Sequence, residues 1–329
     1  MSKMMDTYAR QPVNFEKGEG VWLWTQDGKK YLDALSGVAV NGLGHAHPKL
    51  IKAINEQISK LIHVSNVYHI AEQEKLAEKL TSISGMDNVF FCNSGCEANE
   101  AAIKLARLYG HQNGIDTPEI IVMEKAFHGR TMATLSATGN RKTQAGFEPL
   151  VGGFIRVAFD DIEAIQQIAS RKNNVVAILV EPIQGEGGIN IPSNIQNYLK
   201  GLREICNQHQ WLLMLDEVQS GIGRTGKWFA HQHTSIHPDV MTLAKGLGSG
   251  VPIGACLARG KASQVFTPGK HGSTFGGNPL ATAAGYATLN IIEEEKLCSH
   301  AEKMGALINE EFTKHLKDCP QVKVIRHLG

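Results

Sequence analysis

The sequence predicts an α/β fold in which a mostly parallel sheet lies between helices. Short apolar runs recur along the chain, such as residues 175–181 and 211–215, and segments with the spacing of amphipathic helices separate them. Parallel strands that are buried on both faces are typically continuous apolar runs, and each crossover between them needs a helix. With 329 residues, the chain is long enough for one large domain and a smaller one.

The first hundred residues combine a hairpin with helices. Large apolar residues alternate with polar ones over residues 20–35, around Asp27-Gly28, which predicts a β-hairpin. Apolar residues at helical spacing predict helices over 48–62 and 71–80. A short strand and a turn of small residues then precede a third predicted helix, over 96–109.

The remainder of the chain alternates strands and helices. We expect strands over 119–124, 175–181, 211–217, 240–245 and 254–258, and helices over 160–171 and 195–209. A helix-rich tail ends in the strand-like residues 322–325 with nothing after them to pair, so we expect the chain to be incomplete. We predict three parts: residues 1–45 contribute to a small domain, 46–277 form the large domain, and 278–329 begin the rest of the small domain.

The composition argues against several classes of function. There are 33 Lys and Arg residues against 32 Asp and Glu, so no basic surface for nucleic acid or for an anionic membrane is indicated. The first ten residues lack the apolar core of a signal peptide, and no apolar run is as long as a membrane span, so we expect a cytoplasmic protein. The six cysteines form no CxxC pair, and we predict neither a metal site nor a disulfide framework.

A glycine-rich stretch after residue 217 does not indicate a nucleotide site. Gly221, Gly223 and Gly226 have GxGxxG spacing. The dinucleotide motif needs a helix that opens at the third glycine, and residues 227–239 are a poor helix. A P-loop needs Ser or Thr where this chain has Trp228.

Several functional side chains stand where strands or helices are expected to begin or end. Asp216 ends an apolar strand, where an unpaired carboxylate is costly, and Lys245 lies between apolar residues and glycines. Ser94 precedes a helix whose free N–H groups attract phosphate, and Phe127 and Arg130 follow the next strand. Taken singly, each has an ordinary structural explanation as a helix cap, a core ring or a solvent-facing cation. Together they supply the phosphate cradle, aromatic ring, carboxylate and lysine that pyridoxal 5′-phosphate (PLP) requires.

Seven motifs, in matching order, resemble a known family: NGLGHAHP, NSGCEANEAAIKLAR, FHGRT, VEPIQGEGG, LDEVQSGIGRTG, LAKGLGSGVPIGA and HGSTFGGNPLA. On these motifs the chain resembles the class III aminotransferases of PLP fold type I over essentially its whole length. The resemblance implies a large domain with a mostly parallel seven-stranded sheet between helices, plus a smaller α+β domain. It also implies PLP as the cofactor and a homodimer with shared active sites.

The resemblance implies how the matching residues would hold the cofactor. Lys245 would bind it covalently and move a proton between the substrate Cα and the cofactor, and Asp216 would pair with the pyridine nitrogen. Phe127 would stack on the ring, Gln219 would contact its phenolic oxygen, and N–H groups at the helix start would hold the phosphate. The implied cofactor-binding residues are Ser94, Gly95, Cys96, Phe127, Asp216, Glu217, Val218, Gln219, Lys245 and Thr274.

Further matching residues would contact the substrate. Arg130 matches the family's arginine for a substrate carboxylate, a role that suits a two-pronged donor. Ser273 and Thr274 match a pair that reaches in from the second subunit, Thr274 to the phosphate and Ser273 to the substrate. Glu186 matches a glutamate that pairs with a C-terminal arginine for one substrate and releases it for the other. That arginine lies beyond residue 329 in the family pattern, and Arg326 stands too early to replace it.

The resemblance is closest to members that act on N2-acetylornithine. It implies transfer of the terminal amino group of N2-acetylornithine to 2-oxoglutarate, giving N-acetylglutamate 5-semialdehyde and glutamate, a step of arginine biosynthesis. Succinylornithine, ornithine and 4-aminobutyrate are alternative donors within the same fold. A catalytically inactive, PLP-free binding homologue is an alternative of another class, against which the joint presence of Asp216, Lys245, Phe127 and Thr274 argues.

Overall fold

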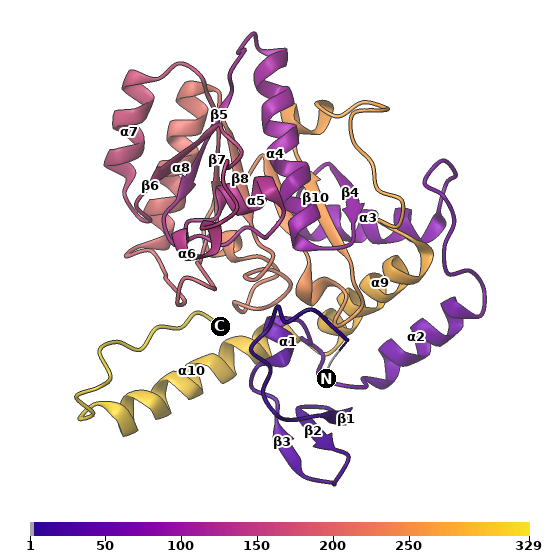
Figure 1. Ribbon diagram of the computed structural model, residues 1–329. Helices are drawn as coiled ribbons and strands as arrows, with labels where there is room; N and C mark the ends of the chain where they lie inside the picture. Colours follow the sequence, from indigo (N-terminus) through magenta and orange to yellow (C-terminus); the bar gives the residue numbers. More distant parts are fainter. Residues whose placement is uncertain (1–2) are drawn as a thin grey trace.

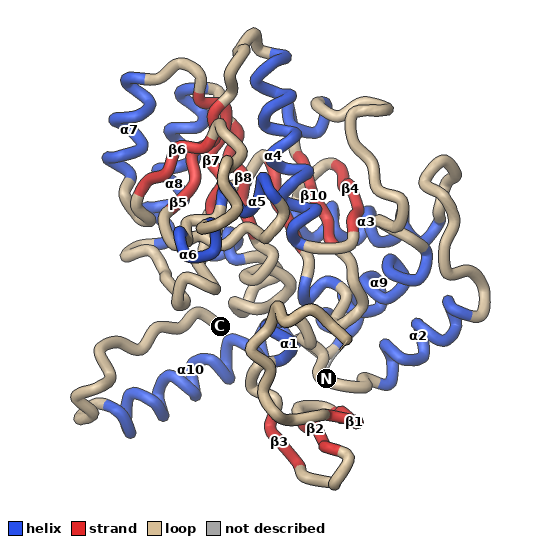
Figure 2. Tube along the Cα trace, in the orientation of Figure 1, coloured by secondary structure: helices blue, strands red, loops and turns tan. Residues whose placement is uncertain are grey.

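The computed structural model describes residues 3–329, and a seven-stranded sheet lies at its centre (Figures 1 and 2). The strand order is β4-β10-β9-β8-β7-β5-β6. The strands are β4 (Asn88–Cys92), β5 (Glu119–Met123), β6 (Phe154–Val157), β7 (Val175–Val180), β8 (Leu212–Asp216), β9 (Val240–Leu243) and β10 (Gly254–Ala258). Only β10 runs antiparallel to its neighbours among these strands, so the predicted mostly parallel seven-stranded sheet is confirmed.

Helices cover both faces of the sheet, and the alternation of side chains along each strand assigns residues to a face. In β5, Ile120 and Val122 pack with α4 (Gly95–Gln112), whereas Ile121 and Met123 pack with α7 (Ile162–Arg171) and α8 (Ile195–His209). Successive side chains of a strand point to opposite faces, so a strand that is covered on both sides must be apolar at every position. This explains why the central strands are continuous apolar runs. In Figure 1, α4 lies in front of the sheet and α7 lies to its left.

The N-terminal strands form a separate antiparallel sheet of three strands. They are β1 (Phe15–Glu19), β2 (Trp22–Thr25) and β3 (Lys30–Leu32), in that spatial order. The predicted hairpin at Asp27-Gly28 is confirmed, since β2 and β3 pair across this turn and Gly28 has the positive φ of +81° that favours glycine. In Figure 1 this small sheet lies below the large one.

Longer helices complete the fold beside the sheet. They are α2 (Pro48–Ile58), α3 (Ala71–Ser84), α9 (Pro279–Glu294) and α10 (Leu297–Leu316), and α9 packs along both α2 and α3. Short helices and 3-10 turns fill the connections: α1 (Ser36–Ala39), α5 (Met132–Ala137), α6 (Arg141–Gln144), η1 (Ala230–His233), η2 (Lys245–Leu247) and η3 (Gly260–Gln264). Of the residues that the structure describes, no helix is both long and apolar enough to cross a membrane.

Two details of the predicted elements differ from the structure. The strand-like residues 322–325 are irregular in the structure, because a strand exists only where a neighbour completes its hydrogen bonds. The short edge strand β6 was not predicted, because its four residues include a charged Arg156 and give no clear alternation.

Candidate active site

A cavity of about 370 Å³ opens at the carboxyl end of β8, where the strands of such sheets carry their ligand sites. Three separate segments meet there: the end of β8 with Asp216, the start of η2 with Lys245, and the start of α4 with Ser94. The predicted residues that line the cavity are Ser94, Gly95, Cys96, Phe127, Glu186, Asp216, Val218, Gln219 and Lys245. The structure therefore brings together most of the side chains that the sequence singled out.

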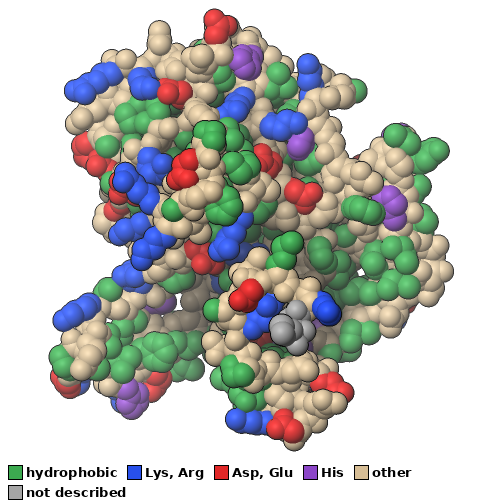
Figure 3. Space-filling model, viewed as in Figure 1, with side chains coloured by type: hydrophobic (Ala, Val, Ile, Leu, Met, Phe, Trp, Pro, Cys, Tyr) green, Lys and Arg blue, Asp and Glu red, His purple; other side chains and the backbone are tan. Residues whose placement is uncertain are grey.

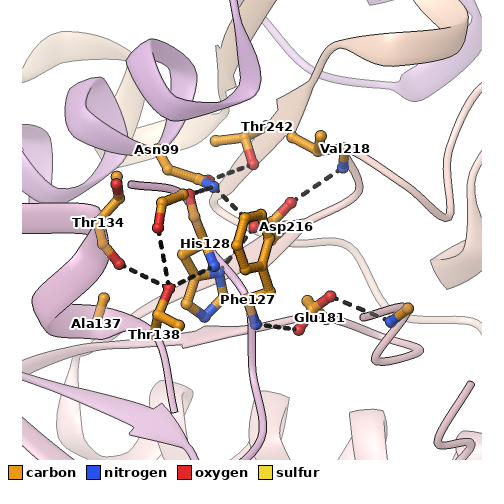
Figure 4. A network of polar contacts seen from close by, with 12 residues as sticks. Asn99, Phe127, His128, Thr134, Ala137, Thr138, Glu181, Asp216, Val218 and Thr242 are labelled. Atoms are coloured by element: carbon orange, nitrogen blue, oxygen red, sulfur yellow. Dashed lines mark hydrogen bonds and ion pairs between the residues drawn. The ribbon is translucent and has the colours of Figure 1, made fainter. Parts of the chain in front are cut away.

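Asp216 is held in one orientation by donors on three sides (Figure 4). Its position in β8 gives it the same face as Leu212 and Met214, which is the face that α4 covers. Its Oδ2 lies 2.7 Å from Nδ2 of Asn99 on α4 and 2.7 Å from Nδ1 of His128, and its Oδ1 accepts from the Val218 N–H at 3.0 Å. A buried carboxylate needs such partners, and these three donors fix the orientation of Asp216.

The hydrogen bonds around Asp216 show which ring nitrogen of His128 carries a proton and which way the side-chain amide of Asn99 faces. Because a carboxylate only accepts, Nδ1 of His128 carries a proton. Thr242, which is paired with Asp216 across β8 and β9, donates to Oδ1 of Asn99 at 2.7 Å, so the amide nitrogen of Asn99 must face Asp216. Thr138 accepts from the His128 N–H at 3.0 Å. Among the described residues, Nε2 of His128 is buried without a hydrogen-bond partner.

Lys245 opens η2, with one residue between it and the end of β9, and has a left-handed φ of +46°. A non-glycine residue in this region stores about 1–3 kcal/mol of strain and persists only where the surroundings hold it. Burial lowers the pKa of the Lys245 ammonium from its ordinary value of 10.5, and the carboxyl groups of Asp216, Glu186 and Glu181 oppose that effect. The outcome is an amine that loses its proton more readily than a lysine in water does.

The start of α4 offers backbone N–H groups to the cavity. Ser94 is the N-cap and accepts from the Glu97 N–H at 3.2 Å, while Glu97 accepts from the Asn93 N–H at 2.8 Å. The first N–H groups of a helix have no partner within it, and the helix dipole adds positive potential. Two glycines allow the close packing that places this turn: a Cβ on Gly95 would lie 2.8 Å from Val218, and one on Gly254 would lie 2.4 Å from the Ser94 carbonyl oxygen.

Two glutamates occupy different depths of the site. Glu181 follows β7 and is buried, and its desolvation and the nearby charge of Asp216 raise the pKa of its carboxyl group well above the ordinary value of 4.5. Glu186 is exposed at the cavity edge. Arg326 does not contact Glu186; it donates to the carbonyl oxygens of Gly188 and Ile189, at 2.5 and 2.9 Å, in the same loop.

Glu217, one of the predicted cofactor-binding residues, is not brought to the cavity. Its carboxylate accepts from the N–H groups of Ala230 and His231 at 2.6 and 2.9 Å and from the Ser220 hydroxyl at 3.0 Å. Consecutive residues at a strand end point in opposite directions, so Glu217 faces away from the side that Asp216 faces. Its contacts stabilise the turn into η1 instead.

Three other predicted residues lie outside the cavity lining of this chain. Arg130 is exposed, with its guanidinium carbon 5.8 Å from the centre of the Phe127 ring. The Ser273 hydroxyl accepts from the Gly276 N–H at 2.9 Å, which folds the loop that it shares with Thr274. Thr274 is exposed.

A comparison with protein families decides which chemistry this arrangement serves. The model of the class III aminotransferase family matches residues 4–329. The chain belongs to the class III aminotransferases. This membership confirms the family and the transaminase activity that the sequence motifs indicated.

Relatives of this class III aminotransferase match along its whole length. It is 65% identical to the acetylornithine aminotransferase of Nitrosomonas europaea, over all of this chain and 83% of that protein. It is 52% identical to acetylornithine aminotransferase 1 of Bordetella bronchiseptica, with the same two coverages.

Solved structures agree with the fold. The ornithine aminotransferase of Toxoplasma gondii superposes with a TM-score of 0.96 at 36% identity, over 99% of this chain and 78% of that one. The acetylornithine aminotransferase of Elizabethkingia anophelis superposes with a TM-score of 0.89 at 40% identity, over 99% of this chain and 80% of that one.

Class III aminotransferases use PLP, and the residues of this class III aminotransferase fit it. The cavity combines a fixed carboxylate (Asp216), an aromatic ring (Phe127), an amine with a lowered pKa (Lys245) and the open start of α4. In that order, these groups have the chemistry needed to bind the pyridine nitrogen, the ring, the aldehyde and the phosphate of PLP.

Sequence reasoning missed several polar residues that hold the site together. They are Asn99, His128, Thr242 and Glu181, all buried. Asn99 carried a usable signal, because a polar residue between the buried positions Ala98 and Ala101 of a helix needs a buried partner. His128 was hidden inside a motif that we interpreted only through its neighbours Phe127 and Arg130.

Proposed function

We propose that this enzyme transfers the terminal amino group of N2-acetylornithine to 2-oxoglutarate, giving N-acetylglutamate 5-semialdehyde and glutamate. The observation that carries the proposal is 65% identity, along the whole chain, to the acetylornithine aminotransferase of Nitrosomonas europaea. Identity at this level over every motif favours the same donor class more strongly than fold similarity does.

Ornithine is the second candidate donor. The superposition on the ornithine aminotransferase of Toxoplasma gondii, with its TM-score of 0.96, favours it, but the identity of 36% is much lower. Single-turnover amino transfer with acetylornithine, succinylornithine, ornithine and 4-aminobutyrate separates the candidates. We expect acetylornithine to react fastest, and faster conversion of an unacylated donor would contradict the proposal.

The chain's own residues divide the work of cofactor binding and proton transfer. When bound, PLP supplies an electron sink for the bond cleavage at the substrate carbon. Asp216 holds positive charge at the pyridine nitrogen, Phe127 packs on the ring, and Gln219 donates toward the ring oxygen. The N–H groups of Ser94, Gly95 and Cys96 at the start of α4 hold the phosphate, with Val218 packed against that turn.

Lys245 is the residue that moves the proton. Its lowered pKa supports this role, because a general base works best when its pKa is near the operating pH. The amine takes the proton from the substrate carbon and returns it to the cofactor side, so that the same residue serves as base and then as acid. Loss of visible absorbance of lysine-bound PLP in Lys245→Ala is the direct check.

Arg130 and Glu186 are the proposed substrate contacts on this chain. Arg130 lies beside the Phe127 ring, and Glu186 stands at the cavity edge, so the two charges flank the entrance. We assign the substrate α-carboxylate to Arg130 and the choice between the two substrates to Glu186. Arg130→Lys should raise the KM for the donor, because lysine cannot form the paired hydrogen bonds of a guanidinium.

A homodimer with shared sites accounts for the position of Ser273 and Thr274. Thr274 is exposed here, and its neighbour Phe275 is 62% exposed. Asn66 joins this loop to the segment with Val67, which is 81% exposed, by donating to the carbonyl oxygens of Ser273 and Gly276. Figure 3 shows hydrophobic side chains over α2 and the loop after it. Such a surface fits a second copy of the chain, into whose site Thr274 and Ser273 would reach.

We further propose a cytoplasmic location. All six cysteines are free, including the neighbouring buried residues Cys92 and Cys256. Reduced thiols are typical of proteins in the cytoplasm. Cell fractionation followed by detection of the chain tests this proposal.

A further inference from the structure

Glu181 joins two segments that contribute residues to the cavity. It follows the last residue of β7 and is 5% exposed. Its Oε2 accepts from the Phe127 N–H at 2.9 Å, and its Oε1 accepts from the Gly185 N–H at 3.3 Å (Figure 4). One side chain therefore accepts backbone hydrogen bonds from two loops that are far apart in the sequence.

The two N–H groups belong to segments with different tasks in the proposed function. Phe127 contributes the ring that packs on the cofactor, and Gly185 precedes Glu186 at the cavity edge. A Cβ on Gly185 would lie 1.2 Å from the side-chain oxygen of Gln219, so this loop packs directly on Gln219. A shift of Gly185 therefore moves both Gln219 and Glu186.

The rest of the Glu186 loop is rigid and would move as a unit. Gln184 and Asn190 exchange backbone hydrogen bonds at 3.0 Å, and the Asn190 side chain donates to the Gly187 carbonyl oxygen at 3.0 Å. Arg326 holds the outer side of the loop through Gly188. Gln184 also ties this loop to the end of β5, by donating to the Glu124 carbonyl oxygen at 2.7 Å. The contact between Glu181 and Gly185 is thus a second link that sets the position of the loop relative to the sheet.

The residue type at position 181 fits this task. Burial and the charge of Asp216 both make a carboxyl group costly here, as the raised pKa of Glu181 reflects. A glutamate nevertheless offers two acceptor oxygens at that reach, whereas a glutamine offers one acceptor and would turn an NH₂ group toward the other N–H.

We propose that Glu181 is a positioning residue that fixes the Phe127 segment and the Glu186 loop relative to each other. The positional part of this proposal, that Glu181 holds the two segments in place, depends only on its two hydrogen bonds. Its consequence for cofactor and substrate binding rests on the proposed function.

The positional part is tested by hydrogen exchange of the full chain without added cofactor. In Glu181→Leu, we expect the Phe127 and Gly185 amides to exchange about tenfold faster or more, since each loses an acceptor worth about 1–3 kcal/mol. Glu181→Gln keeps one acceptor and should deprotect only one of the two amides. Glu119→Gln, at the opposite end of the neighbouring strand β5 and in a surface pair with Lys172, is the matched control and should leave both unchanged. Unchanged exchange in Glu181→Gln, which keeps the shape of the side chain, overturns the proposal.

The functional consequence is measured by PLP titration and by steady-state kinetics. We expect Glu181→Gln to weaken PLP binding by about tenfold and to raise the KM for the amino donor more than it lowers kcat, because binding geometry rather than proton transfer is altered. Faster exchange with unchanged PLP affinity and KM would support the hold of Glu181 on the two segments but overturn its proposed consequence for cofactor and substrate binding. If the unaltered protein bound no PLP, the proposed function would fail, while the exchange data would still decide whether Glu181 holds the two loops.

Discussion

His128 and Asp216 form a buried polar contact in which Nδ1 lies 2.7 Å from Oδ2, with side-chain exposures of 0% and 3%. The imidazole donates to the same oxygen that accepts from Asn99, so this oxygen is fully engaged on the protein side. The contact keeps the carboxylate pointed along one direction. A fixed orientation suits a group that must hold positive charge on a bound heterocycle.

Removal of His128 should therefore weaken catalysis without unfolding the site. His128→Leu conserves the buried volume and removes one charge-assisted hydrogen bond, worth about 1.5–3 kcal/mol, so we expect kcat to fall by about 10- to 100-fold. The KM for the amino donor should change little, because His128 touches Asp216 rather than the substrate region. Steady-state kinetics measure both constants.

A double-mutant cycle checks that His128 acts through Asp216. The effects of His128→Leu and Asp216→Asn should be strongly non-additive, since both disturb one hydrogen-bonded group. Additive effects would show that the histidine has an independent role. Thr138→Val, which alters the support of the His128 backbone but not its ring, is a useful comparison.

The lowered pKa of Lys245 gives a prediction of pH dependence. The neutral amine is the reactive form, and its fraction rises with pH, so a lower pKa moves the rise in reactivity to a pH below 10.5. Competitive labelling of the chain without cofactor by acetic anhydride, followed by mass spectrometry, measures this curve for each lysine. Lys49, whose pKa is raised by its contacts with Glu294 and Glu295, is an internal control and should be labelled at higher pH than Lys245.

The same experiment tests the cause of the shift. The carboxylate of Asp216 opposes the lowering, so Asp216→Asn should move the labelling midpoint of Lys245 further down. A midpoint of Lys245 equal to that of Lys49 in the unaltered chain would contradict the assigned role of burial.

The sequence was sufficient for six of the seven strands of the large sheet and for the residues at its carboxyl edge, because both follow from local patterns. Continuous apolar runs marked the parallel strands, and Asp216 and Lys245 stood out as the charges that end two of them. Glu217 was assigned to the cofactor with its neighbour, although alternation along a strand allows only one of two consecutive residues to face a given side. That rule was available from the sequence alone.

The partners of Asp216 could not be predicted because they depend on which segments the fold brings together. Asn99 and Thr242 come from a helix and a strand that are far apart along the chain, and only the sheet order places them around one carboxylate. The domain boundaries after residues 45 and 277 stay predictions. One core contains Leu289 of α9 together with Leu76 of α3 and Leu257 of β10, so packing continues across the second boundary.

The proposed sharing of sites predicts complementation between two inactive variants. If Thr274 serves the site of the other subunit, a dimer of one Lys245→Ala chain and one Thr274→Ala chain has one intact site and one doubly defective site. Random pairing of equal amounts should then restore about a quarter of the normal activity. Without sharing, no site in the mixed dimer has both residues, and activity should not exceed that of Thr274→Ala alone. Co-expression with two affinity tags isolates the mixed dimer.

The start of α4 should be sensitive to a single methyl group at Gly254. A Cβ at this position would lie 2.4 Å from the Ser94 carbonyl oxygen and 2.9 Å from the Cys92 sulfur, and the first of these is backbone that cannot rotate away. Gly254→Ala must therefore push the Ser94 turn away from β10 and disturb the N–H groups that we assign to the phosphate. Since an ion at a helix start gains about 0.3–2 kcal/mol from the dipole alone, we expect PLP binding to weaken by about tenfold or more.

Inorganic phosphate distinguishes this local effect from a general loss of stability. Phosphate should compete with PLP in the unaltered chain, and its inhibition constant should rise in Gly254→Ala in parallel with the PLP dissociation constant. Gly152→Ala is the control, because a Cβ there meets nothing within 4 Å and should change neither constant. If Gly254→Ala lowered the melting temperature but left both constants unchanged, the start of α4 would not be the phosphate site, and the assignment of Ser94, Gly95 and Cys96 would have to be withdrawn.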